Sequence, residues 1–128
     1  MPRILIVDDE ETDLLLMQSV LARAGYQTDA AVTGEDALRR YLDDSVDVVI
    51  TDLQMPDVHG FELITILREF ADPPAVIAVS GTGPFQLHMA EQLGARWTLA
   101  KPVDPALLLD AVERALRWEG DANTLKSG

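Results

Sequence analysis

Four short polar segments carry the side chains of this chain that could act together in chemistry. Each segment follows an apolar run, and the four are Asp8-Asp9-Glu10, Thr51-Asp52, Ser80-Gly81 and Lys101-Pro102. Carboxylates that gather from separate segments repel one another, by about 4 kcal/mol for two charges about 4 Å apart near a protein surface. Such a cluster therefore protonates one member, pairs with a lysine or binds a cation.

Mg²⁺ is the cation that best matches these residue types. It takes oxygen ligands, needs few protein carboxylates and leaves positions for water and phosphate. Once the cluster is neutralised, Asp52 can stay ionised and act as a nucleophile toward phosphorus. Lys101 and the Ser80 hydroxyl would then meet the charge on the transferring phosphoryl oxygens. The residue types thus indicate Mg²⁺-dependent phosphoryl transfer to Asp52.

The apolar runs before these segments predict the strands of a sheet. We expect strands at residues 4–7, 29–32, 46–50, 75–79 and 97–100. Three of the runs are continuous and rich in β-branched residues, which is typical of parallel strands buried on both faces.

The segments between the runs have the apolar spacing and end signals of helices. Thr33 and Asp104 stand where N-caps are expected, Pro84 opens a helix, and Gly25 and Gly94 end two others. Strand and helix alternate five times, which with right-handed crossovers predicts an α/β fold in three α/β/α layers. We expect a flavodoxin-like, doubly wound, five-stranded parallel sheet of order 2-1-3-4-5 with five helices. Its carboxyl edge, where ligands bind, would gather the four polar segments.

Composition and charge narrow the class of protein. A net charge of -12 and scattered basic residues argue against direct nucleic-acid binding. The absence of cysteine excludes disulfides and thiolate sites. No run approaches the roughly 18 apolar residues of a membrane span. We expect a cytoplasmic protein with one domain at residues 1–118 and a flexible polar tail at 119–128.

The same segments resemble those of a known family. Their order and separations resemble those of response-regulator receiver domains. The segments are Arg3-Ile-Leu-Ile-Val-Asp-Asp-Glu10, Asp52-Leu-Gln-Met-Pro56 with the later Gly60, Ala78-Val-Ser-Gly81, and Gly94-Ala95 through Lys101-Pro102. Each segment alone is a weak signal, whereas all of them together are a strong one. The chain therefore resembles the CheY-like receivers of two-component signalling over nearly its whole length.

The resemblance implies a role for each acidic residue. Asp52 looks like the residue that becomes aspartyl phosphate. Asp9 and Asp52 look like direct Mg²⁺ ligands together with the backbone carbonyl of Gln54, and Asp8 looks like a ligand through water. Donors for such domains are phosphohistidines on a sensor histidine kinase or a histidine phosphotransfer protein. The reaction is self-catalysed and ends in autodephosphorylation, so the resemblance implies no separate enzymatic activity.

The resemblance also implies a phosphoryl-binding set and a route to output. Ser80, Lys101 and the backbone N–H of Gly81 look like the groups that contact the phosphoryl oxygens, with a cis Lys101–Pro102 peptide bond. The family usually carries Tyr or Phe three residues before the lysine as a switch. Here that position is Thr98, and the aromatic residue is its neighbour Trp97.

The fourth predicted helix, residues 85–93, has an apolar arc wider than one buried stripe needs. If Trp97 also faces outward, Phe85 and Trp97 would belong to an apolar patch over the fourth helix, fifth strand and fifth helix. Receivers commonly use that face for homodimers or protein targets. The alternative is a helix packed more deeply than usual.

Other functions fit the same residues less well. A pseudo-receiver, an interaction scaffold without phosphorylation, would not need the complete set of acids, Ser80 and Lys101. A Mg²⁺-dependent phosphatase usually has a second Asp where Gln54 stands. A flavodoxin needs a phosphate-binding loop where the first strand runs into acids. Taken singly, the first acidic cluster could be a helix entry and Lys101 a surface lysine, and we assign no role to His59 or His88.

Overall fold

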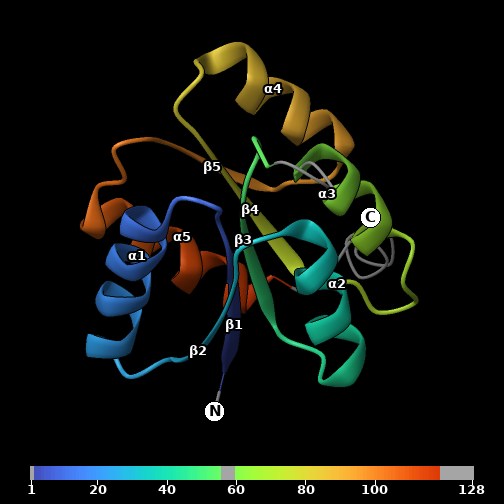
Figure 1. Cartoon of the computed structure of the whole chain (residues 1–128), viewed down its shortest axis with the longest axis horizontal. Coiled ribbons are helices and arrows are strands. Elements are labelled where there is room, and N and C mark those ends of the chain that lie inside the picture. Colours follow the sequence, from blue (N-terminus) through green and yellow to red (C-terminus); the bar gives the residue numbers. More distant parts are fainter. Residues whose placement is uncertain (1, 56–59, 119–128) are drawn as a thin grey trace.

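A five-stranded parallel sheet lies between two layers of helices (Figure 1). The computed structural model describes residues 2–55 and 60–118. The strand order is β2-β1-β3-β4-β5, and five helices alternate with the strands along the chain. Helices α1 and α5 cover one face of the sheet, and α2, α3 and α4 cover the other. The predicted fold and strand order are confirmed.

The elements have the following bounds. The strands are β1 Arg3–Val7, β2 Gln27–Ala31, β3 Val48–Asp52, β4 Ala75–Ser80 and β5 Trp97–Ala100. The helices are α1 Glu11–Arg23, α2 Gly34–Asp43, α3 Gly60–Arg68, α4 Pro84–Leu93 and α5 Pro105–Arg117.

Burial explains which strands the sequence located well. All residues of β3 and β4 are buried, as continuous β-branched runs predict. β4 begins at Ala75 as predicted, whereas β3 covers Val48–Asp52 and so lies two residues later than the predicted 46–50. The edge strand β2 begins at Gln27, two residues before its predicted start, and Val32 lies beyond it and is exposed. The polar residues of β2 are exposed or half-buried, and they give no apolar run to mark this edge strand.

The predicted helix ends agree with the structure. The Thr33 side chain accepts a hydrogen bond from the Asp36 N–H at 3.0 Å, and the Asp104 side chain accepts one from the Ala106 N–H at 2.8 Å. Gly94 follows α4 at a φ of 134°, a conformation that favours glycine. These caps fix where each helix meets the sheet.

Alternation along the strands divides the interior into two apolar clusters. Leu5 and Val49 point toward α2, α3 and α4, whereas Ile4, Ile6 and Ile50 point toward α1 and α5. Burial of one such side chain contributes about 1.5–3 kcal/mol. The two clusters together hold the carboxyl ends of β1, β3, β4 and β5 at one edge.

Three sequence-based expectations fall partly outside this description. The tail at 119–128 and His59 lie outside the described residues, and the domain boundary at residue 118 stays a prediction. His88 is exposed on α4, with Nδ1 3.9 Å from a carboxylate oxygen of Glu91. Within residues 2–55 and 60–118, none of the helices has the length and apolar character needed to cross a membrane.

Candidate functional site

Three carboxylates meet where β1 and β3 end. These two strands are neighbours in the sheet, with Val7 paired to Thr51. Asp8 and Asp9 follow β1, and Asp52 is the last residue of β3. In the part of the chain that the structure describes, these three aspartates each offer a ligand oxygen within 4.8 Å of the others. The structure therefore brings together the acids that the sequence predicted to converge.

Burial raises the free-energy cost of keeping these carboxylates ionised. Asp8 is fully buried, Asp52 is 5% exposed, and Asp9 is exposed. Burial and then the charge of Asp8 raise the pKa of Asp52 to about 6, although Lys101 and the backbone N–H groups of Gln54 and Leu53 act to lower it. The Asp52 carboxylate is consequently mostly ionised at neutral pH and available as a nucleophile.

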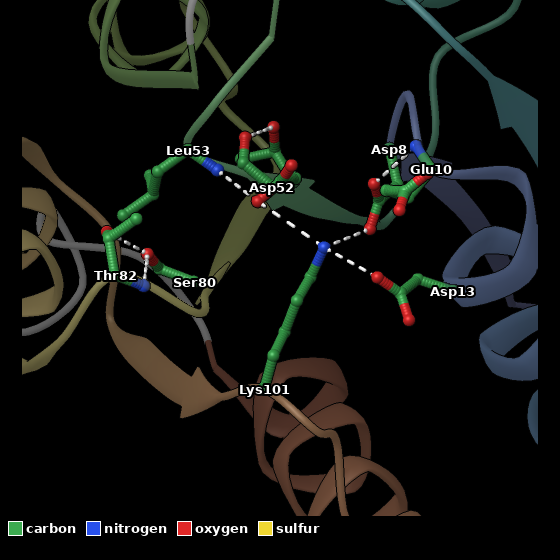
Figure 2. A network of polar contacts seen from close by, with 9 residues as sticks. Asp8, Glu10, Asp13, Asp52, Leu53, Ser80, Thr82 and Lys101 are labelled. Carbon is green, nitrogen blue, oxygen red and sulfur yellow. Dashed lines mark hydrogen bonds and ion pairs between the residues drawn. The ribbon is translucent and has the colours of Figure 1, made fainter.

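Lys101 enters the cluster from the loop after β5 (Figure 2). Its Nζ lies 2.8 Å from Asp8, 3.0 Å from Asp13 and 3.6 Å from Asp52. Burial alone lowers the pKa of Lys101, but hydrogen bonds to Asp8 and Asp13 and the charges of Asp52 and Asp8 together raise that pKa above its usual value. The Lys101–Pro102 peptide bond is cis, as the family resemblance implies.

Ser80 ends β4 and is buried. Its hydroxyl oxygen lies 2.7 Å from the Thr82 hydroxyl and accepts a hydrogen bond from the Thr82 N–H at 3.1 Å. Gly81 follows directly, and a Cβ atom there would lie 3.6 Å from Cβ of Lys101. Figure 2 shows Ser80 and Thr82 on the other side of Lys101 from Asp8 and Asp13.

Glycine is required where α3 begins. A Cβ atom on Gly60 would overlap the carbonyl oxygen of Asp52 and lie 2.6 Å from Cα of Leu53. The first turn of α3 therefore rests directly on the backbone of the central aspartate. Gln54 is exposed nearby, and its role as a carbonyl ligand stays a prediction.

The three residues predicted for switching and output occupy different surroundings. Thr98 is half-buried in β5 and pairs with Ala78. Trp97 packs into the cluster below α1 and α5, edge-on to Trp118 with ring centroids 6.3 Å apart. Phe85 on α4 is 68% exposed. Because Trp97 turns toward α5, the exposed apolar surface of α4 is formed by Phe85 and the 40% exposed Met89 without it.

Two contacts escaped the sequence reasoning. Asp13 contacts Lys101, and Thr82 holds the Ser80 hydroxyl. A signal for each was present: Asp13 falls in the first turn of a helix that starts at the carboxylate edge, and Thr82 is two residues after Ser80 in a Ser-Gly-Thr-Gly turn.

Comparison with known proteins identifies the architecture. A family profile described as the response regulator receiver domain matches residues 4–113. The chain belongs to this receiver family. Protein PilH of Pseudomonas aeruginosa is 32% identical to this receiver over 119 residues, covering 91% of this chain and 98% of PilH. The structure of the chemotaxis response regulator CheY4 of Vibrio cholerae matches with a TM-score of 0.83 at 29% identity, over 91% of this chain and 99% of that one.

Other relatives are much longer than this receiver. The sensory/regulatory protein RpfC of Xanthomonas campestris is 33% identical over 115 residues, which are 86% of this chain but 16% of RpfC. The chain thus spans a small part of this relative. Membership of this family makes the chain a receiver domain of two-component signalling.

Proposed function

We propose that this receiver accepts a phosphoryl group onto Asp52 in a Mg²⁺-dependent reaction. One observation carries the proposal. A buried, mostly ionised aspartate has a lysine ammonium 3.6 Å away and two further carboxylates within 4.8 Å. This arrangement supplies a nucleophile, a cation for the phosphoryl oxygens and a ligand set for a metal ion. The donor is a phosphohistidine on a sensor histidine kinase or a histidine phosphotransfer protein.

The donor set fits Mg²⁺. The three carboxylates outweigh the single charge of Lys101, which Asp13 also shares, and the ligand atoms are all oxygens. Asp9 and Asp52 would hold the ion directly with the carbonyl of Gln54, and Asp8 would hold it through water. The bound ion supplies positive charge beside the reacting oxygens.

The residues of this chain perform the transfer as follows. A carboxylate oxygen of Asp52 forms a bond to phosphorus while the bond from phosphorus to the imidazole nitrogen of the donor breaks. Lys101, the Ser80 hydroxyl and the Gly81 N–H stabilise charge on the transferring oxygens. Attack by water on the same phosphorus later returns the carboxylate. The chemistry is confined to self-catalysed phosphorylation and autodephosphorylation, with no activity on other substrates.

Output runs through protein contacts that depend on phosphorylation. The face over α4, β5 and α5 presents Phe85 and Met89 and suits a second copy of the receiver or a protein target. With a net charge of -12, the receiver is not expected to bind nucleic acid directly. We place it in the cytoplasm, where the ATP that phosphorylates the kinase is available.

A pseudo-receiver that acts without phosphorylation is the second candidate. One observation favours it, because Thr98 stands where the family's switch aromatic is usual. The complete set of Asp8, Asp9, Asp52 and Lys101 weighs against it, since a scaffold has no need to bury two carboxylates that share one lysine.

Intact mass spectrometry separates the two candidates. The folded protein is incubated with Mg²⁺ and acetyl phosphate. A single phosphoryl adduct that is absent without Mg²⁺ and absent in Asp52→Asn supports the receiver function. If the folded wild type gains no adduct, the scaffold is favoured.

A further inference from the structure

The first turn of α1 contributes a carboxylate that the proposed phosphorylation chemistry leaves without a role. Asp13 is the third residue of this helix, and its side chain is 37% exposed. Its carboxylate lies 3.0 Å from Nζ of Lys101, closer than the 3.6 Å that separates this ammonium from Asp52 (Figure 2). Asp13 does not belong to the group formed by Asp8, Asp9 and Asp52.

The distances rank the partners of the lysine. An ammonium group has three N–H donors, and the two shortest contacts of Lys101 go to Asp8 and Asp13. Asp52 is the most distant of the three carboxylates and shares only an ion pair. The lysine is therefore held toward α1, on the side of the site away from Ser80.

Asp13 differs from the other two partners of Lys101 in its relation to the proposed metal site. Asp8 and Asp52 belong to the cluster that fits a divalent cation, so a bound cation would weaken their attraction for Lys101. Asp13 lies outside that cluster, so a bound cation would weaken its attraction for Lys101 less. Its contact with Lys101 consequently persists in the state that is ready for phosphorylation.

We propose that Asp13 is a positioning residue that retains Lys101 in competition with the incoming phosphoryl group. While Asp13 holds the lysine on the α1 side and shares its charge, the lysine stabilises the transferring oxygens less, which slows phosphorylation of Asp52. This inference rests on the proposed function. It adds a control on the rate of that reaction, exerted from α1.

The test measures the rate of adduct formation with acetyl phosphate at saturating Mg²⁺. Asp13→Asn should raise the rate about two- to fivefold, the range expected when a partly exposed ion pair no longer competes. Asp13→Glu keeps the charge and should keep the slow rate. Glu11→Gln is the matched control, because it removes the same charge from the same turn and Glu11 has no ion pair with Lys101.

A double-mutant cycle tests whether Asp13 acts through the lysine. In a Lys101→Met background, Asp13→Asn should no longer change the rate. A second readout needs no phosphorylation: in the Mg²⁺-loaded protein, Asp13→Asn should shift the NMR signals of the Lys101 side chain, and Glu11→Gln should leave them in place.

Several outcomes would overturn the inference. The adduct could form no faster in Asp13→Asn than in Glu11→Gln. Asp13→Asn could also accelerate adduct formation equally in the Lys101→Met background. Either result would reveal a general charge effect. Unmoved Lys101 signals would also count against it. If wild type forms the adduct and Asp13→Asn matches it, this inference alone fails. If folded wild type forms no adduct, the proposed function fails first.

Discussion

Replacing Asp52 by asparagine should make the metal-free protein more stable at neutral pH. The pKa of Asp52 rises from 3.8 in the unfolded chain to about 6 in the fold, because of burial and then the charge of Asp8. The difference of roughly two, at about 1.36 kcal/mol each, means that ionised Asp52 costs about 3 kcal/mol at pH 7.5. A neutral asparagine side chain at this position would carry no such cost.

The sign of the effect follows from proton binding. Below about pH 3 the carboxyl is protonated in both states and costs nothing. As pH rises, the unfolded chain loses this proton before the folded one does, so stability from Asp52 declines until pH passes about 6. The advantage of Asp52→Asn should therefore be full at pH 7.5 and about half as large at pH 5.

The assay is urea denaturation in EDTA at these two pH values. Asp43→Asn, at an exposed position at the end of α2, serves as control and should change the free energy of unfolding by less than about 0.5 kcal/mol. Adding Mg²⁺ should stabilise wild type and narrow its gap to Asp52→Asn, since the ion binds the folded state. A lower free energy of unfolding for Asp52→Asn than for wild type at pH 7.5 would refute the reasoning. It would also be refuted if the difference in free energy of unfolding between the two proteins were the same at both pH values.

Three further predictions concern the metal, the backbone and the output face. Asp9→Ala should abolish the Mg²⁺-dependent rise in Tm seen by calorimetry, and a rise equal to that of wild type would remove Asp9 from the ligand set. Gly60→Ala should lower the free energy of unfolding by about 1–3 kcal/mol in urea, because the new Cβ overlaps the backbone of Asp52; unchanged stability would contradict that contact. Phe85→Ala should weaken self-association of the phosphorylated protein in sedimentation, whereas Leu42→Ala, at an equally exposed position of 68%, should not. Equal effects from both would exclude a specific α4 surface.

The convergence of the acids was predictable from the sequence because topology alone enforces it. The buried strands β1 and β3 are marked by continuous apolar runs, and parallel strands end at one edge. Asp8 and Asp52 directly follow or end those runs, so no side-chain detail was needed to bring them together.

The contact of Asp13 was not predictable in the same way. Apolar spacing gives the phase of α1, but the partner of a partly exposed first-turn side chain depends on how the helix leans over the sheet. The direction of Trp97 raised a similar difficulty. Alternation places Trp97 and Leu99 on one face of β5 and Thr98 on the other, yet only the packing of α5 and Trp118 decides which face is covered.

The sheet divides the interior of the domain into two separate apolar clusters. Among the residues that the structure describes, the apolar cluster beneath α2, α3 and α4 shares no buried side chain with the cluster beneath α1 and α5. Substitutions on opposite sides that lie more than about 7–10 Å apart should therefore add in their effects on unfolding. The side that presents Phe85 can then acquire new binding partners without loosening the side from which Asp13 reaches the lysine. The side chains that contact partners and those that set the reaction rate can change separately, while phosphorylation of Asp52 still couples the two.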